Sequence, residues 1–179
     1  MTLLLTTVHW LSAAAYPLAL AYAVVSDSRR LIIPNGACIV IAAAFLSAAL
    51  AGGFGLTLMA WHFGVGAGLF GVGLFLFSQR IMGGGDVKLL AAVGIWVGWG
   101  DLWPFLYLTA ILGGGLALCI FFAGRLGKIF PFLTSIAWMQ EDAGKKQPIP
   151  YGVAIGLAAI IMFSKSPVLP AAWGSALGL

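Results

Sequence analysis

Six long apolar segments constrain the fold of this chain more than any other feature. They cover about residues 3–25, 31–51, 54–77, 87–100, 103–123 and 149–163. Hydrophobic residues make up 62% of the chain and charged residues only 8%, which is more apolar surface than one soluble core of 179 residues can bury. Lipid admits only helices or closed barrels, and the segments lack the alternation of barrel strands. The sequence therefore predicts a single all-α polytopic membrane domain over residues 1–179, with about six transmembrane helices.

The segments differ in length, and this affects how each one meets the bilayer. The first has no basic region before its long apolar run, so we expect a first transmembrane helix rather than a cleaved signal peptide. The fourth and sixth are shorter than the roughly 20 residues that span a bilayer. These two require tilt, local thinning of the bilayer or burial against neighbouring helices.

The basic residues predict the orientation of the domain. With the N-terminus outside, the inner connections hold eight of the nine Lys and Arg residues, namely Arg29, Arg30, Arg80, Lys88, Arg125, Lys128, Lys145 and Lys146. Lys165 alone lies outside. Because Lys and Arg concentrate in cytoplasmic loops, we expect the N-terminus outside. The net charge of +4 then reflects topology and contact with anionic membrane lipid, and no nucleic-acid partner is expected.

The long inner connection, residues 124–147, carries apolar residues at helical spacing. This spacing predicts a cytosolic loop that contains a helix lying on the inner membrane surface. Pro131 fits such a helix only in its first turn or at a kink.

Two aspartates lie at the predicted cytosolic ends of apolar segments. Asp27 is in "AVVSDSRRLIIPN" and Asp86 is in "MGGGDVKLL". A single acid at a membrane edge is often an interfacial anchor, but a carboxylate inside a span costs about 2.5–3.5 kcal/mol and usually has a function. The glycines before Asp86, residues 83–85, each cost a helix up to about 1 kcal/mol relative to alanine. They predict an unwound turn, or a close approach of another backbone, beside Asp86.

Paired carboxylates at one depth are suited to peptide hydrolysis. Two neighbouring carboxyl groups share one proton, because like charges a few Å apart resist double ionisation. The ionised group can activate water while the protonated group polarises the scissile carbonyl. We therefore predict that Asp27 and Asp86 are catalytic. Two roles are open for Lys88, which either anchors the segment at the lipid headgroups or tunes the pair.

Three blocks of the sequence resemble the type IV prepilin peptidases. The "GGGD" at residues 83–86 is similar to the GxGD motif of that family, and "SDSRRLIIPN" resembles its first aspartate block. The "IPYGVA" from Ile149 resembles a last block that commonly reads Pro-Tyr-Gly-Pro-Ala, with Val153 in place of the second proline. The resemblance implies catalytic roles for Asp27 and Asp86. It also implies roles in the motifs and in substrate positioning for Gly83, Gly85, Lys88, Pro34, Asn35, Pro150, Tyr151 and Gly152.

The resemblance is closest to the short members of the family that serve Flp/Tad-type pili. It implies an aspartic endopeptidase of the bacterial inner membrane whose active site faces the cytosol and removes the basic leader of a prepilin or pseudopilin. Longer members carry a cysteine-containing N-terminal region associated with methylation, so peptidase activity without methylation is expected here. Membrane lipid and the pilus assembly machinery complete the expected partners.

No cofactor or metal is expected. His9 and His62 lie far from the aspartates and lack acids or cysteines at ligand spacing. The glycines at 64, 68, 94, 98 and 113–115 include small-xxx-small spacings, which we attribute to helix packing. The tryptophans at 10, 96, 99, 103 and 173 are typical of an aromatic belt at the outer interface.

Two other functions compete with a peptidase. In an ion- or proton-coupled transporter the two aspartates would be ion ligands, but such sites typically lie at the midplane between repeated halves, and no repeat is visible. A non-catalytic pilus assembly factor would keep the same fold, and only an activity measurement separates it from an enzyme.

Overall fold

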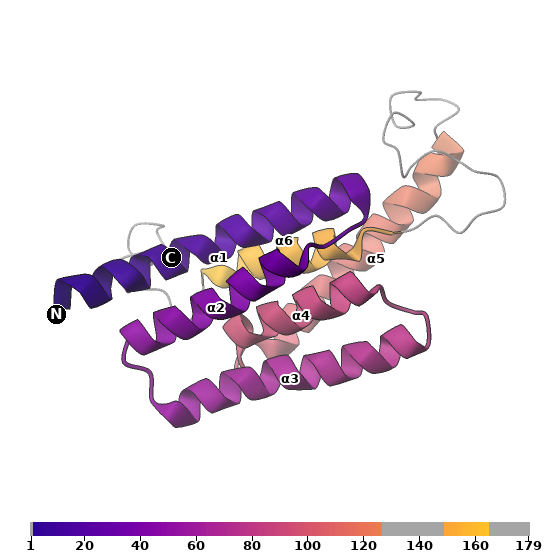
Figure 1. The fold of residues 1–179 in the computed structure, drawn as a ribbon. Helices are drawn as coiled ribbons and strands as arrows, with labels where there is room; N and C mark the ends of the chain where they lie inside the picture. The colour runs from indigo at the N-terminus through magenta and orange to yellow at the C-terminus, as the bar shows by residue number, and fades with distance from the viewer. Residues whose placement is uncertain (1, 127–148, 165–179) are drawn as a thin grey trace.

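The computed structural model describes residues 2–126 and 149–164, and these residues form six helices (Figure 1). The helices are α1 (Thr2–Arg30), α2 (Asn35–Ala51), α3 (Leu56–Ser78), α4 (Gly84–Val97), α5 (Leu102–Leu126) and α6 (Tyr151–Phe163). Each of the six predicted apolar segments corresponds to one helix, and no strand occurs in the described ranges. The predicted all-α fold is therefore confirmed.

Three of the helices are long and apolar enough to cross a bilayer, namely α1, α3 and α5. Helices α2 and α6 are apolar but shorter. Helix α4 has 14 residues, a length of about 21 Å at 1.5 Å per residue. Ten residues of α4 and seven of the 13 residues of α6 are buried, so burial against neighbouring helices accommodates these short segments. The chain is a polytopic membrane protein.

Helix α4 occupies the centre of the bundle. It packs along α3 and also contacts α2, α5 and α6, while α1 pairs with α2 and α6 packs against α1 and α5. Figure 1 shows that α1 and α3 end on the side of the bundle where α2, α4 and α6 begin. This side therefore gathers helix ends that come from distant parts of the sequence.

Glycines allow α3 and α4 to approach each other closely. A Cβ added to Gly66 would lie 2.5 Å from Cγ1 of Ile95, and a Cβ added to Gly94 would lie 2.5 Å from Cδ1 of Leu69. One added to Gly73 would lie 2.7 Å from Cγ1 of Val87. These contacts confirm the predicted packing role for Gly94. They also assign that role to two glycines of α3 that were not among the predicted ones.

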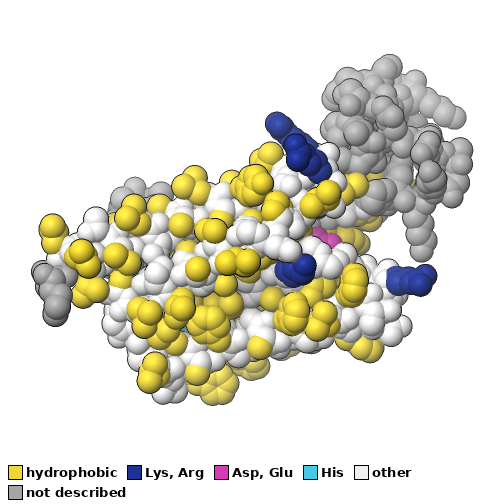
Figure 2. Space-filling model, in the orientation of Figure 1, with side chains coloured by type: hydrophobic (Ala, Val, Ile, Leu, Met, Phe, Trp, Pro, Cys, Tyr) yellow, Lys and Arg dark blue, Asp and Glu magenta, His cyan; other side chains and the backbone are white. Residues whose placement is uncertain are grey.

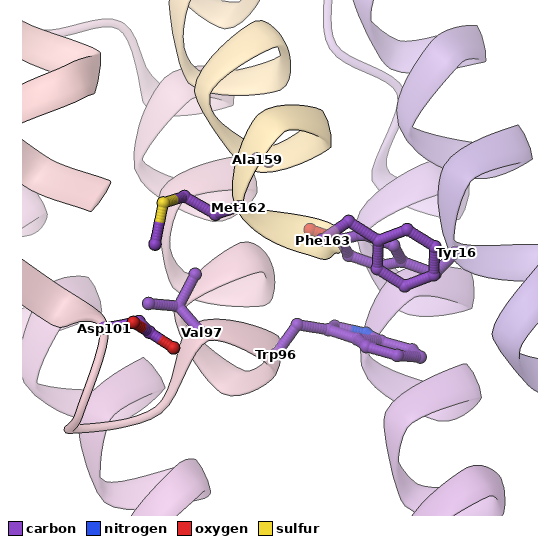
Figure 3. Close-up of a pocket in the computed structure, with 7 residues that line it drawn as sticks. All are labelled: Tyr16, Trp96, Val97, Asp101, Ala159, Met162 and Phe163. Atoms are coloured by element: carbon purple, nitrogen blue, oxygen red, sulfur yellow. The ribbon is translucent and has the colours of Figure 1, made fainter. Parts of the chain in front are cut away.

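An aromatic cluster joins α1, α4 and α6 farther along the bundle (Figure 3). The ring centroid of Tyr16 lies 4.3 Å from that of Trp96 and 4.9 Å from that of Phe163. The indole nitrogen of Trp96 donates a hydrogen bond to the carbonyl of Ile41 at 2.8 Å. The prediction that Trp96 belongs to an interfacial belt is wrong, because this side chain is 1% exposed and lies in the core. Trp99 and Trp103, in contrast, are exposed.

The described basic side chains lie at the end of the bundle where Asp27 and Asp86 are found. Figure 2 shows Lys and Arg side chains around a recess in which acidic side chains are visible. This grouping agrees with the predicted orientation. The predicted surface helix falls in residues 127–148, outside the described residues, and residues 124–126 belong to α5.

The α3–α4 contact leads to a stability prediction. The substitution Gly66→Ala places a methyl group against Ile95 and 3.0 Å from the carbonyl oxygen of Ala91, so we expect it to destabilise the protein by about 1–3 kcal/mol. The matched control is Gly71→Ala on the same helix, where an added Cβ has no heavy atom within 4 Å. Thermal unfolding in detergent should show a lower Tm for the first variant only. Equal Tm values would contradict the proposed packing.

The orientation remains a prediction and can be tested by labelling. In a variant without Cys38 and Cys119, single cysteines at Ile32 and Ile81 should resist a membrane-impermeant thiol reagent in intact cells, and a cysteine at Leu56 should react. All three side chains are exposed, so access to the reagent depends on the side of the membrane. Labelling at the first two positions without cell lysis would reverse the predicted topology.

Candidate active site

Two helix ends bring Asp27 and Asp86 together. Asp27 lies in the last turn of α1, and Asp86 lies in the first turn of α4. Their side chains are 4% and 9% exposed, and they are the buried acids among the described residues. Asp101 lies just before α5, near the aromatic cluster. The two aspartates that the sequence singled out therefore share one site.

The first turn of α6 brings backbone N–H groups close to both carboxyl groups. The N–H of Gly152 interacts with Asp27 and with Asp86. Asp27 also interacts with the N–H of Val153, and Asp86 with that of Gly83 at the start of its own helix. Amides in the first turn of a helix lack intrahelical acceptors and carry partial positive charge, which favours carboxylates. The Oδ2 atom of Asp27 has no hydrogen-bond partner in the described part of the chain.

Val153 occupies the position where the resemblance leads one to expect a second proline. Its backbone N–H, which a proline would lack, faces Asp27 and also donates to the carbonyl of Pro150 at 3.1 Å. Pro150 is the N-cap residue of α6 and is buried. The substitution therefore leaves the start of α6 helical and adds a donor to the site.

The site leaves little room for side chains at three glycines. A Cβ on Gly152 would lie 2.7 Å from Oδ2 of Asp27, and one on Gly83 would lie 2.8 Å from Oδ2 of Asp86. One on Gly85 would lie 3.1 Å from Cβ of Ile33. Close approach, rather than positive φ, is the reason for glycine here, since the described glycines with positive φ are Gly53 and Gly98.

The predicted unwound turn is displaced from where the sequence suggested it. Residues 79–83 form the non-helical connection, and Gly83 is its last, extended residue with φ −72° and ψ 145°. Gly84 and Gly85 lie inside α4 as its first turn. Asp86 is therefore presented by a helix N-terminus, because the helix begins before the carboxylate rather than after it.

Ile33 is a positioning residue that the sequence reading did not single out. It is 8% exposed and lies against both Gly85 and Gly152. Its place in the "IIPN" block, directly before Pro34, is the signal that could have identified it. Ile33 thereby holds the starts of α4 and α6 at their separation.

Lys88 contacts the first block rather than the carboxylates. Its Nζ donates a hydrogen bond to Oδ1 of Asn35 at 2.9 Å, and its side chain is exposed. Pro34 is the N-cap residue of α2, and Asn35 is the first residue of that helix. The bond between Lys88 and Asn35 thus joins the starts of α2 and α4, and none of these three predicted site residues lines the groove described next.

An open groove with a volume of about 1110 Å³ exposes the two carboxyl groups. Asp27, Asp86 and Gly83 line it together with Tyr151, the end of α3 and the connection at residues 79–82. Leu31 and Arg80 also line it, and they are the described non-glycine residues with positive φ, at 54° and 57°. Such backbone strain is concentrated at functional sites. We name this cavity the aspartate groove.

The groove offers acid–base chemistry to a peptide that enters it. It combines two buried carboxyl groups, backbone N–H groups close to them, and access from outside. Among the described residues no group of three potential metal ligands occurs. His9 and His62 bond to the carbonyl oxygens of Ala48 and Ile95, so both have structural partners away from the groove.

Comparison with known proteins agrees with this geometry. The model of the type IV leader peptidase family matches residues 14–118, which include both aspartates and the GxGD motif. No curated protein and no solved structure matches the chain. The matched range covers more than half of the sequence. The chain therefore belongs to the type IV leader peptidase family.

Proposed function

We propose that this chain is an aspartic endopeptidase that removes the basic leader of type IV or Flp-like prepilins at the cytosolic face of the membrane. Family membership already makes it a leader-peptidase-type protease with a peptide substrate. The observation that carries the finer proposal is that Asp27 and Asp86, the two buried acids of the described residues, line one open groove.

In the proposed reaction the two carboxyl groups act as a unit that holds one proton. The ionised group takes a proton from water, whose oxygen attacks the scissile carbonyl carbon, while the protonated group donates a hydrogen bond to the carbonyl oxygen. The tetrahedral intermediate collapses as the C–N bond breaks, and a carboxyl proton passes to the leaving nitrogen. Backbone amides of α6 and α4 hold the carboxyl groups in position without titrating themselves.

The position of the groove supports a cut at the edge of the bilayer. A prepilin has a basic leader followed by a hydrophobic helix, and the peptide bond between them lies where lipid meets the cytosol. The aspartate groove lies among helix ends and beside basic residues, which are features of a cytosolic membrane edge. The aspartate groove, which residues 79–83 line beside Asp86, has room for an extended peptide.

The first activity prediction concerns the pair. Asp27→Asn and Asp86→Asn should each abolish cleavage of a prepilin while the protein still inserts into membranes. The double variant should be little worse than either single variant, because residues that act as a unit are strongly non-additive. Asp101→Asn, near the aromatic cluster, is the control and should keep activity. Near-normal cleavage by either single variant would exclude a dyad and favour a transporter or an assembly factor.

The second activity prediction concerns Gly152. Gly152→Ala places a methyl group 2.7 Å from both Oδ2 of Asp27 and Cδ1 of Ile33. Because a displacement of about 1 Å at a reacting group can cost 10²-fold, we expect cleavage to fall by about that factor. Gly84→Ala is the matched control, since its added Cβ meets Phe77 at an ordinary 3.4 Å. Prepilin cleavage should be compared per amount of folded enzyme, and equal losses in the two variants would contradict the argument.

A further inference from the structure

A second, apolar groove runs along the side of the bundle between α3 and α5. Helix α3 lines it from Trp61 to Leu76, α5 lines it from Leu102 to Gly114, and Leu90 of α4 is part of its wall. Its volume is about 840 Å³. We call this cavity the lateral groove.

The lateral groove leads into the aspartate groove. Met82 and Tyr151 line both cavities. At the end of the bundle away from the aspartates, the lateral groove is lined by the exposed side chains of Trp61 in α3, Trp103 in α5 and Trp99 in the turn between α4 and α5. A hydrophobic segment lying in this groove would therefore run from the aromatic end of the bundle to the two carboxyl groups.

Three of the four glycines that line the lateral groove are not explained by packing within the described chain, whereas Gly113 meets Tyr151 and Ala154. A Cβ added to Gly64, Gly68 or Gly114 would have no heavy atom within 4 Å. Helix packing was the role predicted for Gly64, Gly68 and Gly114. On α3, Gly66 does have this role. Glycine destabilises a helix by up to about 1 kcal/mol relative to alanine. At these three positions no contact within the described chain offsets that loss of helix stability. Bare helix surfaces of this kind allow another helix to approach closely in a membrane.

A polar atom in the same groove is also without a partner. Thr109 lines the groove from α5, and its buried Oγ1 makes no hydrogen bond within the described residues. Threonine hydroxyl groups commonly bond across helix–helix contacts in membranes. Because this atom is buried, a bond to an incoming helix would need the Thr109 side chain to rotate toward the groove, and lipid chains would offer no such bond.

The dimensions suit one helix. From Trp61 to Leu76 the groove follows α3 for 15 residues, which is about 22 Å at 1.5 Å per residue. A helix about 10 Å across occupies roughly 1,700 Å³ over that length. The groove volume is about half of this, so it would receive one face of a helix and leave the other face in lipid.

We propose that the lateral groove binds the hydrophobic helix of the prepilin substrate. Binding there would hold the junction between helix and leader over Asp27 and Asp86. This inference rests on the proposed peptidase function. It assigns the affinity for the substrate to the hydrophobic helix of the prepilin. The aspartate groove then needs to recognise only the short extended segment that is cut.

The test uses pairs of glycines that differ in whether they line the groove. Gly68→Leu and Gly114→Leu fill it, while Gly71→Leu and Gly115→Leu add the same side chain on the same helices outside it, where an added Cβ also has no neighbour within 4 Å. With full-length Flp-type prepilin in detergent micelles, we expect kcat/KM to fall by at least about tenfold in the first pair only, a loss that corresponds to about 1.4 kcal/mol. Equal rates in all four variants would overturn the proposal.

Cross-linking tests the groove independently of catalysis. In an Asp86→Asn variant without Cys38 and Cys119, a cysteine at Gly68 should form a disulfide with a cysteine in the prepilin helix, and a cysteine at Gly71 should not. A cross-link between two enzyme chains would indicate a second copy in the groove, and absence of both cross-links would indicate lipid; either result overturns the proposal. If the wild-type protein cleaved no prepilin while the Gly68 cross-link still formed, the peptidase function would fail and substrate binding would stand.

Discussion

The burial of two carboxyl groups among apolar helices is the constraint on which the rest of the structure depends. Such groups are costly in a low-dielectric bundle unless donors surround them. The first turn of α6 brings polar backbone to them, and the N–H of Gly152 lies close to both side chains. That contact requires α6 to begin between the end of α1 and the start of α4. The tight fits around Gly152, Gly85 and Ile33 follow from this requirement.

The remaining contacts hold the three helix ends at fixed positions. Helix α4 is buried along most of its length, and glycines let α3 approach it closely. About ten residues beyond the aspartates, roughly 15 Å along the helices, the aromatic cluster joins α1, α4 and α6 a second time. Near the start of α4, the hydrogen bond from Lys88 to Asn35 joins α2 to α4. Helices tied at two levels resist rotation, so the carboxyl groups keep their directions.

The two grooves present two different kinds of surface. The aspartate groove is open, contains the titratable groups and is bordered by the strained residues Leu31 and Arg80. The lateral groove is lined by apolar and glycine residues and contains the Thr109 hydroxyl, which has no hydrogen-bond partner among the described residues. A prepilin has a matching division, since its leader is polar and its helix is hydrophobic. The proposed function would use the first surface for chemistry and the second for affinity.

The sequence by itself determined the helical membrane fold, because apolar segments of this length have few other ways to satisfy their backbone in lipid. It also singled out Asp27 and Asp86, since acids and glycines are costly in such helices and need a reason. Only the tertiary structure decided which glycines pack, where Trp96 lies and that Ile33 separates α4 from α6. The shared amide of Gly152 and the lateral groove likewise depend on how distant helices meet. Local sequence patterns do not record such contacts, because the contacts depend on the distances between helices and not on the sequence of any single helix.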